Sequence, residues 1–201
     1  MAHHGWFALA PRPETLQDLL SENQIGRIFS AGHLLCDFIQ GGEPSLDPAK
    51  PALILFKNAL AATQTFAHEF QVLGKMLPAV DYQVDESFEL SKARAQSYDS
   101  DERVDYIYPE RAGVRVPAAL VTCWRSPEGV PGCLLVNQSE RPVHVSLSWS
   151  SLNQSWGTSA VSRLTLQTLT GIQNLPAPDS PDAQLGLDLP ALQVSLLKAA
   201  A

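Results

Sequence analysis

The sequence predicts an α+β protein with a helical segment in residues 1–80 and an antiparallel β-sandwich in residues 81–201. Before residue 80, apolar residues recur at helical spacings. After about residue 115, short apolar segments alternate with turns, which is typical of a sandwich. Hydrophobic residues make up 45% of the 201-residue chain, which is enough for a packed core.

The first 47 residues predict one short helix and one ambiguous segment. Residues 11–26 fit a helix, because Pro13 suits a first turn and leucines recur on one face. Within residues 27–40, the apolar stretch 34–39 fits either an interrupted helix or a short buried strand. The sequence Gln40-Gly41-Gly42-Glu43-Pro44 then predicts a turn.

Residues 48–77 predict one long amphipathic helix. Asp47 can cap it, Pro48 suits its first turn and Pro78 ends it. Its apolar residues are three or four apart, or sums of these: Leu53, Phe56, Leu60, Phe66, Phe70, Leu73 and Leu77. A helix of roughly 25 residues is on the order of 38 Å long. We expect its apolar stripe to need a partner that this chain does not contain.

The second half predicts a series of strands. A partly alternating segment at 82–90 precedes a charged, polar connection at 91–113, in which 104–108 fits a short strand. Strands are then expected at 116–124, 131–137, 143–149, 161–169 and 192–197. In residues 143–149, apolar residues alternate with polar ones, including His144, which indicates a strand with one wet face.

Composition argues against several classes of protein. The chain has 14 basic and 21 acidic residues and a net charge of −7, unlike a nucleic-acid binder. No apolar run reaches the roughly 18–20 residues of a membrane span. The first residues lack the basic and apolar regions of a secretory signal, so we expect no signal peptide in this chain. Localisation is otherwise open.

Three cysteines, Cys36, Cys123 and Cys133, do not form a disulfide framework. Cys123 and Cys133 lie on two predicted strands that flank a turn. They could face each other as a cross-strand pair, but two buried thiols are the favoured interpretation. No zinc-ligand spacing, phosphate-binding loop or nucleophile elbow is present, so no metal and no cofactor are predicted.

The candidate ligand-binding residues are Gln40, Glu43 and Trp124. If residues 34–39 form a barrel strand, Gln40 and Glu43 lie at its reactive end and could line a cleft; a plain turn is the simpler alternative. Trp124 could stack on a sugar ring, as could the other tryptophans, Trp6, Trp149 and Trp156, although core packing is the favoured alternative. Asn137-Gln138-Ser139 matches a glycosylation sequon, a pattern that often occurs by chance.

The order of elements resembles a known family. The motifs that carry the resemblance are Trp124-Arg125-Ser126-Pro127-Glu128-Gly129, then Leu134-Leu135-Val136-Asn137, and finally Leu189-Pro190-Ala191-Leu192. From about residue 25 to 200, the chain is similar to the C-terminal portion of barrel-type glycoside hydrolases, in particular the bacterial glycosidase-like family DUF6259. The resemblance implies the last units of a (β/α)8 barrel followed by an accessory β-sandwich.

The resemblance implies a carbohydrate-related protein that is not catalytic alone, because the catalytic carboxylates of such barrels lie on earlier strands. No catalytic residue is therefore assigned. The expected partners are a carbohydrate and the missing barrel segment or a second chain. The first alternative is a free-standing carbohydrate-binding or protein-interaction module. The second is a small enzyme that uses His33, Asp37 and Glu43.

Overall fold

The computed structural model describes residues 26, 29, 30, 51–89, 94–99, 102–107, 115–158 and 161–200. Gly26, Phe29 and Ser30 are helical and buried. The other predictions for residues 1–50, including Gln40 and Glu43, lie outside the described residues. No helix in the described ranges is both long and apolar enough to cross a bilayer.

Most of the described strands form two antiparallel sheets. The larger has the order β1-β7-β8-β13-β10-β11 and the smaller has the order β12-β9-β2. The large sheet comprises β1 (Lys75–Met76), β7 (Ala119–Arg125), β8 (Pro131–Asn137), β13 (Val194–Ala199), β10 (Arg163–Thr168) and β11 (Gly171–Pro176). The small sheet comprises β12 (Gln184–Leu189), β9 (Val143–Ser148) and β2 (Tyr82–Val84).

Two further pairs of strands form two-stranded sheets of their own. β3 (Ser87–Glu89) pairs with β6 (Arg115–Pro117), and β4 (Arg94–Asp99) pairs with β5 (Glu102–Ile107). All strand pairs in the described ranges are antiparallel. The described part of the chain is thus a mixed α+β fold of mostly antiparallel sheets, as predicted. The barrel origin of residues 1–80 stays a prediction.

The sandwich core lies between the two sheets. Alternate residues of β9 and β12, including Val145, Leu147 and Leu187, meet alternate residues of β8 and β13. Tyr82 of β2 packs against the same core. Burial raises the pKa of its phenol above the usual value. A hydrogen bond with the backbone of Val121 lowers this pKa, but by less than burial raises it. The neutral phenol is therefore the form that fits the folded state.

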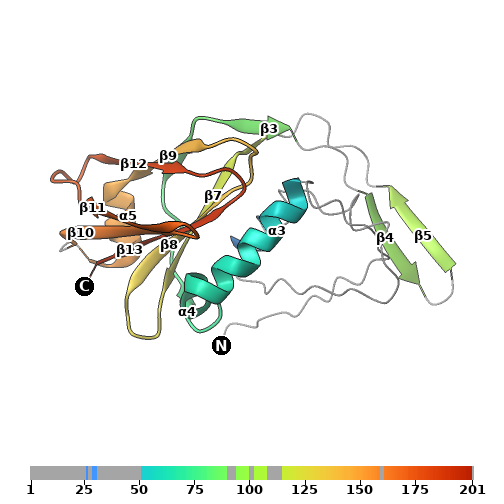
Figure 1. The fold of residues 1–201 in the computed structure, drawn as a ribbon, viewed down its shortest axis with the longest axis horizontal. Helices are drawn as coiled ribbons and strands as arrows, with labels where there is room; N and C mark the ends of the chain where they lie inside the picture. The colour runs from blue at the N-terminus through green and yellow to red at the C-terminus, as the bar shows by residue number, and fades with distance from the viewer. Residues whose placement is uncertain are drawn as a thin grey trace.

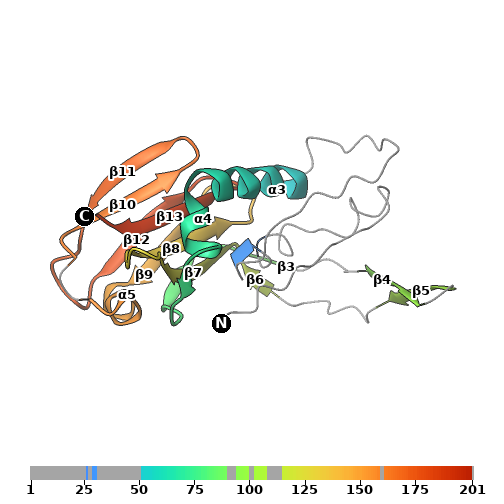
Figure 2. The same ribbon diagram turned by 90° about the horizontal axis from the view of Figure 1, so that it is seen from below.

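One helical run covers the other face of the large sheet, as Figures 1 and 2 show. It consists of α3 (Pro51–Ala62), a π-helical turn η1 (Thr63–Ala67) and α4 (His68–Gln71). Its buried face packs on β7, β8 and β13, together with Leu192. The buried apolar residues of this run are Leu55, Ala59, Ala62, Phe66, Ala67 and Phe70.

The expectation that this helix needs protein from outside the chain is wrong. Its apolar face lies on Trp124, Leu134 and Leu196 of its own large sheet. The predicted stripe was also rotated, because Ala59 and Ala62 form the contact while Leu53 and Leu60 are only half-buried. The strands that cover the helix follow it in the sequence, so its partner is not limited to the residues that precede it.

The helix also ends earlier than predicted, at Gln71 in place of Leu77. Gly74 explains the early end. A Cβ atom at this position would meet the carbonyl oxygen of Phe70 and would lie 2.6 Å from that of Arg125. Because the backbone at Gly74 comes this close to β7, Lys75 and Met76 can pair with Arg125 and Trp124 as strand β1. The chain thus passes from the helix directly into the large sheet.

A second helix, α5 (Trp149–Trp156), follows β9, where the sequence had predicted only the end of a strand. The hydroxyl of Ser148 accepts a hydrogen bond from the amide of Ser151, and Gly157 ends the helix in a left-handed conformation. These are ordinary start and stop signals. Trp149, Leu152 and Trp156 bury one face of α5 in the sandwich core.

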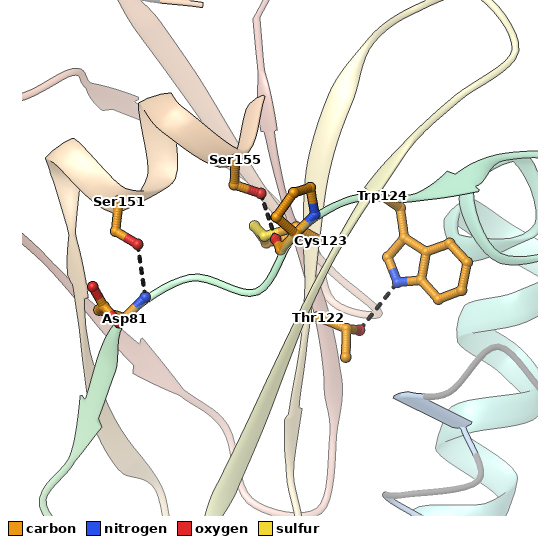
Figure 3. The surroundings of a disulfide bond; sticks show 8 residues. Asp81, Thr122, Cys123, Trp124, Ser151 and Ser155 are labelled. Atoms are coloured by element: carbon orange, nitrogen blue, oxygen red, sulfur yellow. Dashed lines mark hydrogen bonds between the residues drawn. A yellow bond between two sulfur atoms is a disulfide. The ribbon is translucent and has the colours of Figure 1, made fainter. Parts of the chain in front are cut away.

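Cys123 and Cys133 form a disulfide, so the prediction of two buried thiols is wrong. The cysteines face each other on β7 and β8 with their Cα atoms 4.2 Å apart. They are 1% and 0% exposed and belong to the sandwich core. Figure 3 shows Cys123 on one side of β7 and Trp124 on the other, toward the helix.

We predict that replacing Phe70 by Ala lowers the free energy of unfolding by about 3–5 kcal/mol, the usual cost of emptying a buried phenylalanine site. Phe70 is 0% exposed and lies between the helix and β8. Urea unfolding measures the change. Leu73→Ala, one turn away at 60% exposure, is the control and should cost far less. Equal costs would show that the helix does not pack on the sheet.

Removing the disulfide should cost about 3 kcal/mol, because the bond closes a short loop in the unfolded chain. The two cysteines are 10 residues apart in the sequence. The Cys123→Ala/Cys133→Ala double variant should unfold at lower urea concentration than the oxidised protein. A reductant should lower the midpoint of the natural chain and leave that of the double variant unchanged. A reductant effect on the double variant would contradict this assignment.

Candidate functional site

A polar depression of about 300 Å³ lies where the turn after β8 meets the start of β3 and the junction of β6 with β7. Its lining residues are Glu86, Ser87, Ala118, Gln138, Ser139, Glu140 and Arg141. The volume is at the lower end of the range of small-ligand sites, and polar side chains dominate the lining. It is the candidate site within the described ranges.

Asn137, the last residue of β8, shapes the turn that forms one wall. Its side-chain amide donates to the carbonyl oxygens of Arg141, Leu189 and Pro190, at 2.8, 3.2 and 2.9 Å. Its side-chain oxygen accepts from the amide of Ser139 at 2.8 Å. Because Asn137 is fully buried, these bonds replace its contacts with water. One side chain therefore joins this turn to the end of β12.

The opposite wall is held by backbone hydrogen bonds. The amide of Ala118 donates to the carbonyl of Glu86, and the amide of Gln138 donates to the carbonyl of Ala118, both at 2.9 Å. The side-chain amide of Gln138 also donates to the carbonyl of Pro117 at 3.0 Å. These three hydrogen bonds therefore hold together the backbone segments that line the depression.

Charged side chains stand at the rim. The Arg141 guanidinium lies 3.2 Å from the Glu86 carboxylate, and Glu140 adds a second carboxylate. Arg141 is mostly exposed and Glu86 is about one-third exposed, so the pair contributes little to stability. Two carboxylates, one guanidinium and two hydroxyls together offer both donors and acceptors to a polar, uncharged ligand.

The sequence did not single out these residues. The sequence predicts a turn at 139–142 and a single strand at 82–90. The available signal was the buried strand 131–137 ending in Asn137, followed by Gln138-Ser139-Glu140-Arg141. The pairing of that turn with Glu86, across about 50 residues of sequence, is a tertiary contact that no local pattern reports.

Trp124 does not lie at this depression. It is 4% exposed, its indole packs between β7 and the helix, and its N–H donates to the hydroxyl of Thr122 at 3.0 Å (Figure 3). No ring face is open for a sugar, which fits the core-packing alternative. Trp149 and Trp156 are also buried. Gln40 and Glu43 lie outside the described residues, so the structure does not bring the three candidates together.

A histidine–aspartate pair lies on the outer face of the small sheet. Nδ1 of His144 is 2.8 Å from Oδ1 of Asp188, and the amide of His144 donates to Oδ1 of Asp85 at 3.2 Å. His144 is on the wet face of its strand, as predicted. In the described ranges, no group of three or more histidine, cysteine or acidic side chains is arranged to hold a metal ion.

We predict that Asn137→Ala lowers the free energy of unfolding by about 3 kcal/mol, because buried carbonyl groups lose their donor. Asn137→Asp keeps the acceptor for the Ser139 amide but places a carboxylate against three carbonyl oxygens. We therefore expect it to be no better tolerated. Thermal and urea unfolding measure both variants. If Asn137→Asp were as stable as the natural chain, the bonds to the three carbonyls would not matter.

No protein-family model matches the chain, and no curated protein matches it in sequence. Among solved structures, it is similar to alpha-galactosidase I from Mortierella vinacea, with a TM-score of 0.37 and 11% sequence identity. The alignment covers 88% of this chain and 34% of the enzyme, so the chain spans about a third of that enzyme's length. That protein is a glycosidase by name, but a likeness this distant establishes neither a shared fold nor a shared activity.

Proposed function

We propose that this chain is a carbohydrate-binding module that takes neutral saccharides in the polar depression. The observation that carries the proposal is the lining itself: carboxylate, guanidinium and hydroxyl groups on segments that backbone hydrogen bonds hold together. The sequence resemblance to sandwich domains of glycoside hydrolases supports the same class of ligand. The proposal does not depend on the weak structural likeness.

The chemistry of the lining suits sugar hydroxyl groups. Each hydroxyl donates one hydrogen bond and accepts others, and Glu86, Glu140 and Arg141 together supply both kinds of partner. Hydrogen bonds to charged groups are stronger than neutral ones. Because the Glu86–Arg141 pair is partly exposed, a ligand can reach it without breaking a buried ion pair.

The proposed role is binding without bond cleavage. Glycoside hydrolysis generally needs one carboxyl group as acid and a second as base or nucleophile, on either side of the scissile bond. In the barrel enzymes that the sequence resembles, those carboxylates belong to barrel strands that precede the part this chain resembles. The depression is therefore assigned no catalytic residue, and Glu86 and Glu140 are assigned to hydroxyl recognition.

A glycan array followed by calorimetry with the full chain tests the proposal. We expect at least one neutral saccharide to bind, and Glu86→Gln to weaken that binding roughly tenfold or more through loss of a charged hydrogen bond. The control is Glu128→Gln, an exposed carboxylate in the β7–β8 turn that does not line the depression. It should bind as the natural chain does.

Two outcomes would overturn the proposal. The first is the absence of any saccharide binding at millimolar concentration, the weak end of specific recognition. The second is hydrolysis of an aryl glycoside that is lost in Glu86→Gln or Glu140→Gln. That result would make the depression an active site.

A further inference from the structure

Strand β11 is a free edge of the large sheet in the described part of the chain. β11 (Gly171–Pro176) pairs with β10 on one side, and in the described ranges no strand pairs with its other side. Five of its six residues are exposed and the sixth is half-buried. Ile172 is 66% exposed, the highest value among the exposed large hydrophobic residues of the described ranges.

The direction of each backbone group along β11 follows from its ladder with β10. The amide of Ala177 donates to the carbonyl of Ser162 at 3.3 Å, which makes this a hydrogen-bonded pair. Hydrogen-bonded and non-hydrogen-bonded pairs alternate along an antiparallel ladder. The backbone groups of Leu175 and Gln173 therefore point to β10, and those of Ile172 and Asn174 point outward.

The row of backbone groups that point away from β10 is limited at both ends of β11. Pro176 occupies the next outward position and has no N–H to donate. Beyond the other end, the amide of Thr170 already donates to the hydroxyl of Thr168 at 3.2 Å. The outward N–H groups of β11 are therefore those of Ile172 and Asn174, whose carbonyl groups also point outward.

The other edges of the two main sheets are protected by charge or by short length. β12 carries Asp188, β2 has three residues between Asp81 and Asp85, and β1 has two residues, one of which is Lys75. Charged and short edge strands prevent pairing with another chain. β11 is longer than β1 or β2 and carries no charge, in a chain whose net charge is −7.

We propose that β11 pairs with β11 of a second copy of this chain, antiparallel about a two-fold axis through Gln173. In this register, Ile172 faces Asn174 of the partner copy, and Asn174 faces its Ile172. Each of the two symmetry-related pairs exchanges two backbone hydrogen bonds. The two six-stranded sheets become one continuous sheet across the interface.

The side chains fit the same register. Ile172 and Asn174 are on the same side of the strand, because residues two apart share a face. Across the axis, Ile172 of one copy is the diagonal neighbour of Ile172 of the other, within reach of an apolar contact. No like charges meet, because β11 carries none. A second copy is thus a matched occupant in backbone hydrogen bonding and in charge.

Analytical ultracentrifugation over a wide concentration range tests the proposal on the full chain. We expect the mass to rise from that of one chain toward twice that value, reversibly. Asn174→Pro removes an outward N–H that β10 does not use, and should keep the chain monomeric. Asn174→Ala keeps the N–H and is the matched control, which should still dimerise. Ile172→Lys, which places a cation at the interface, is the second disrupting variant.

Hydrogen exchange followed by NMR gives an independent measurement. The amides of Ile172 and Asn174 point to solvent in the monomer, so they should exchange rapidly at low concentration and slowly at high concentration. The proposal is overturned if the chain stays monomeric throughout, or if Asn174→Pro and Ile172→Lys still dimerise. It is also overturned if these amides slow only when a different protein is added, because the edge would then take a foreign strand.

Discussion

The fold depends on one constraint, that the middle strands of the large sheet are covered on both faces. Its central strand β8 is buried at all seven positions. Leu134 and Val136 meet the helix, whereas Cys133 and Leu135 meet the small sheet. Because both faces of β8 are buried, polar side chains are unfavourable at nearly every position, and Pro131–Asn137 is almost continuously apolar. The helix, both sheets and the turn at Asn137 are all positioned relative to this strand.

The same constraint explains which parts of the fold the sequence predicted. The predicted strand 131–137 has the observed bounds, because strong turn signals flank it. The predicted strand 143–149 ends one residue late, because helix α5 begins at Trp149. Gly171–Pro176 and Gln184–Leu189 were missed as separate strands. The second of these alternates clearly, with Leu185, Leu187 and Leu189 buried, so its signal was present. The first is an edge strand with little to bury, and no apolar pattern marks it.

The candidate site could not be predicted in the same way. Glu86, Ala118 and Arg141 come together through hydrogen bonds between segments that are distant in sequence. Trp124 was considered because of its residue type, but its position on β7 directs it toward the helix. The helix also weakens the main physical argument for a truncated barrel, because much of its apolar face packs on its own chain. The carbohydrate hypothesis therefore stands on the depression and on the sequence resemblance.

Asn137 has a practical consequence for producing this protein. Asn137-Gln138-Ser139 is an acceptor sequence for N-linked glycans in eukaryotic secretory cells. In the folded chain, the nitrogen that would carry the glycan donates to three carbonyl groups and is inaccessible. Attachment during synthesis would place a bulky group where the core closes. A chain that carries a glycan on Asn137 would be unable to reach this fold. A host without that modification pathway is therefore the appropriate choice for expression.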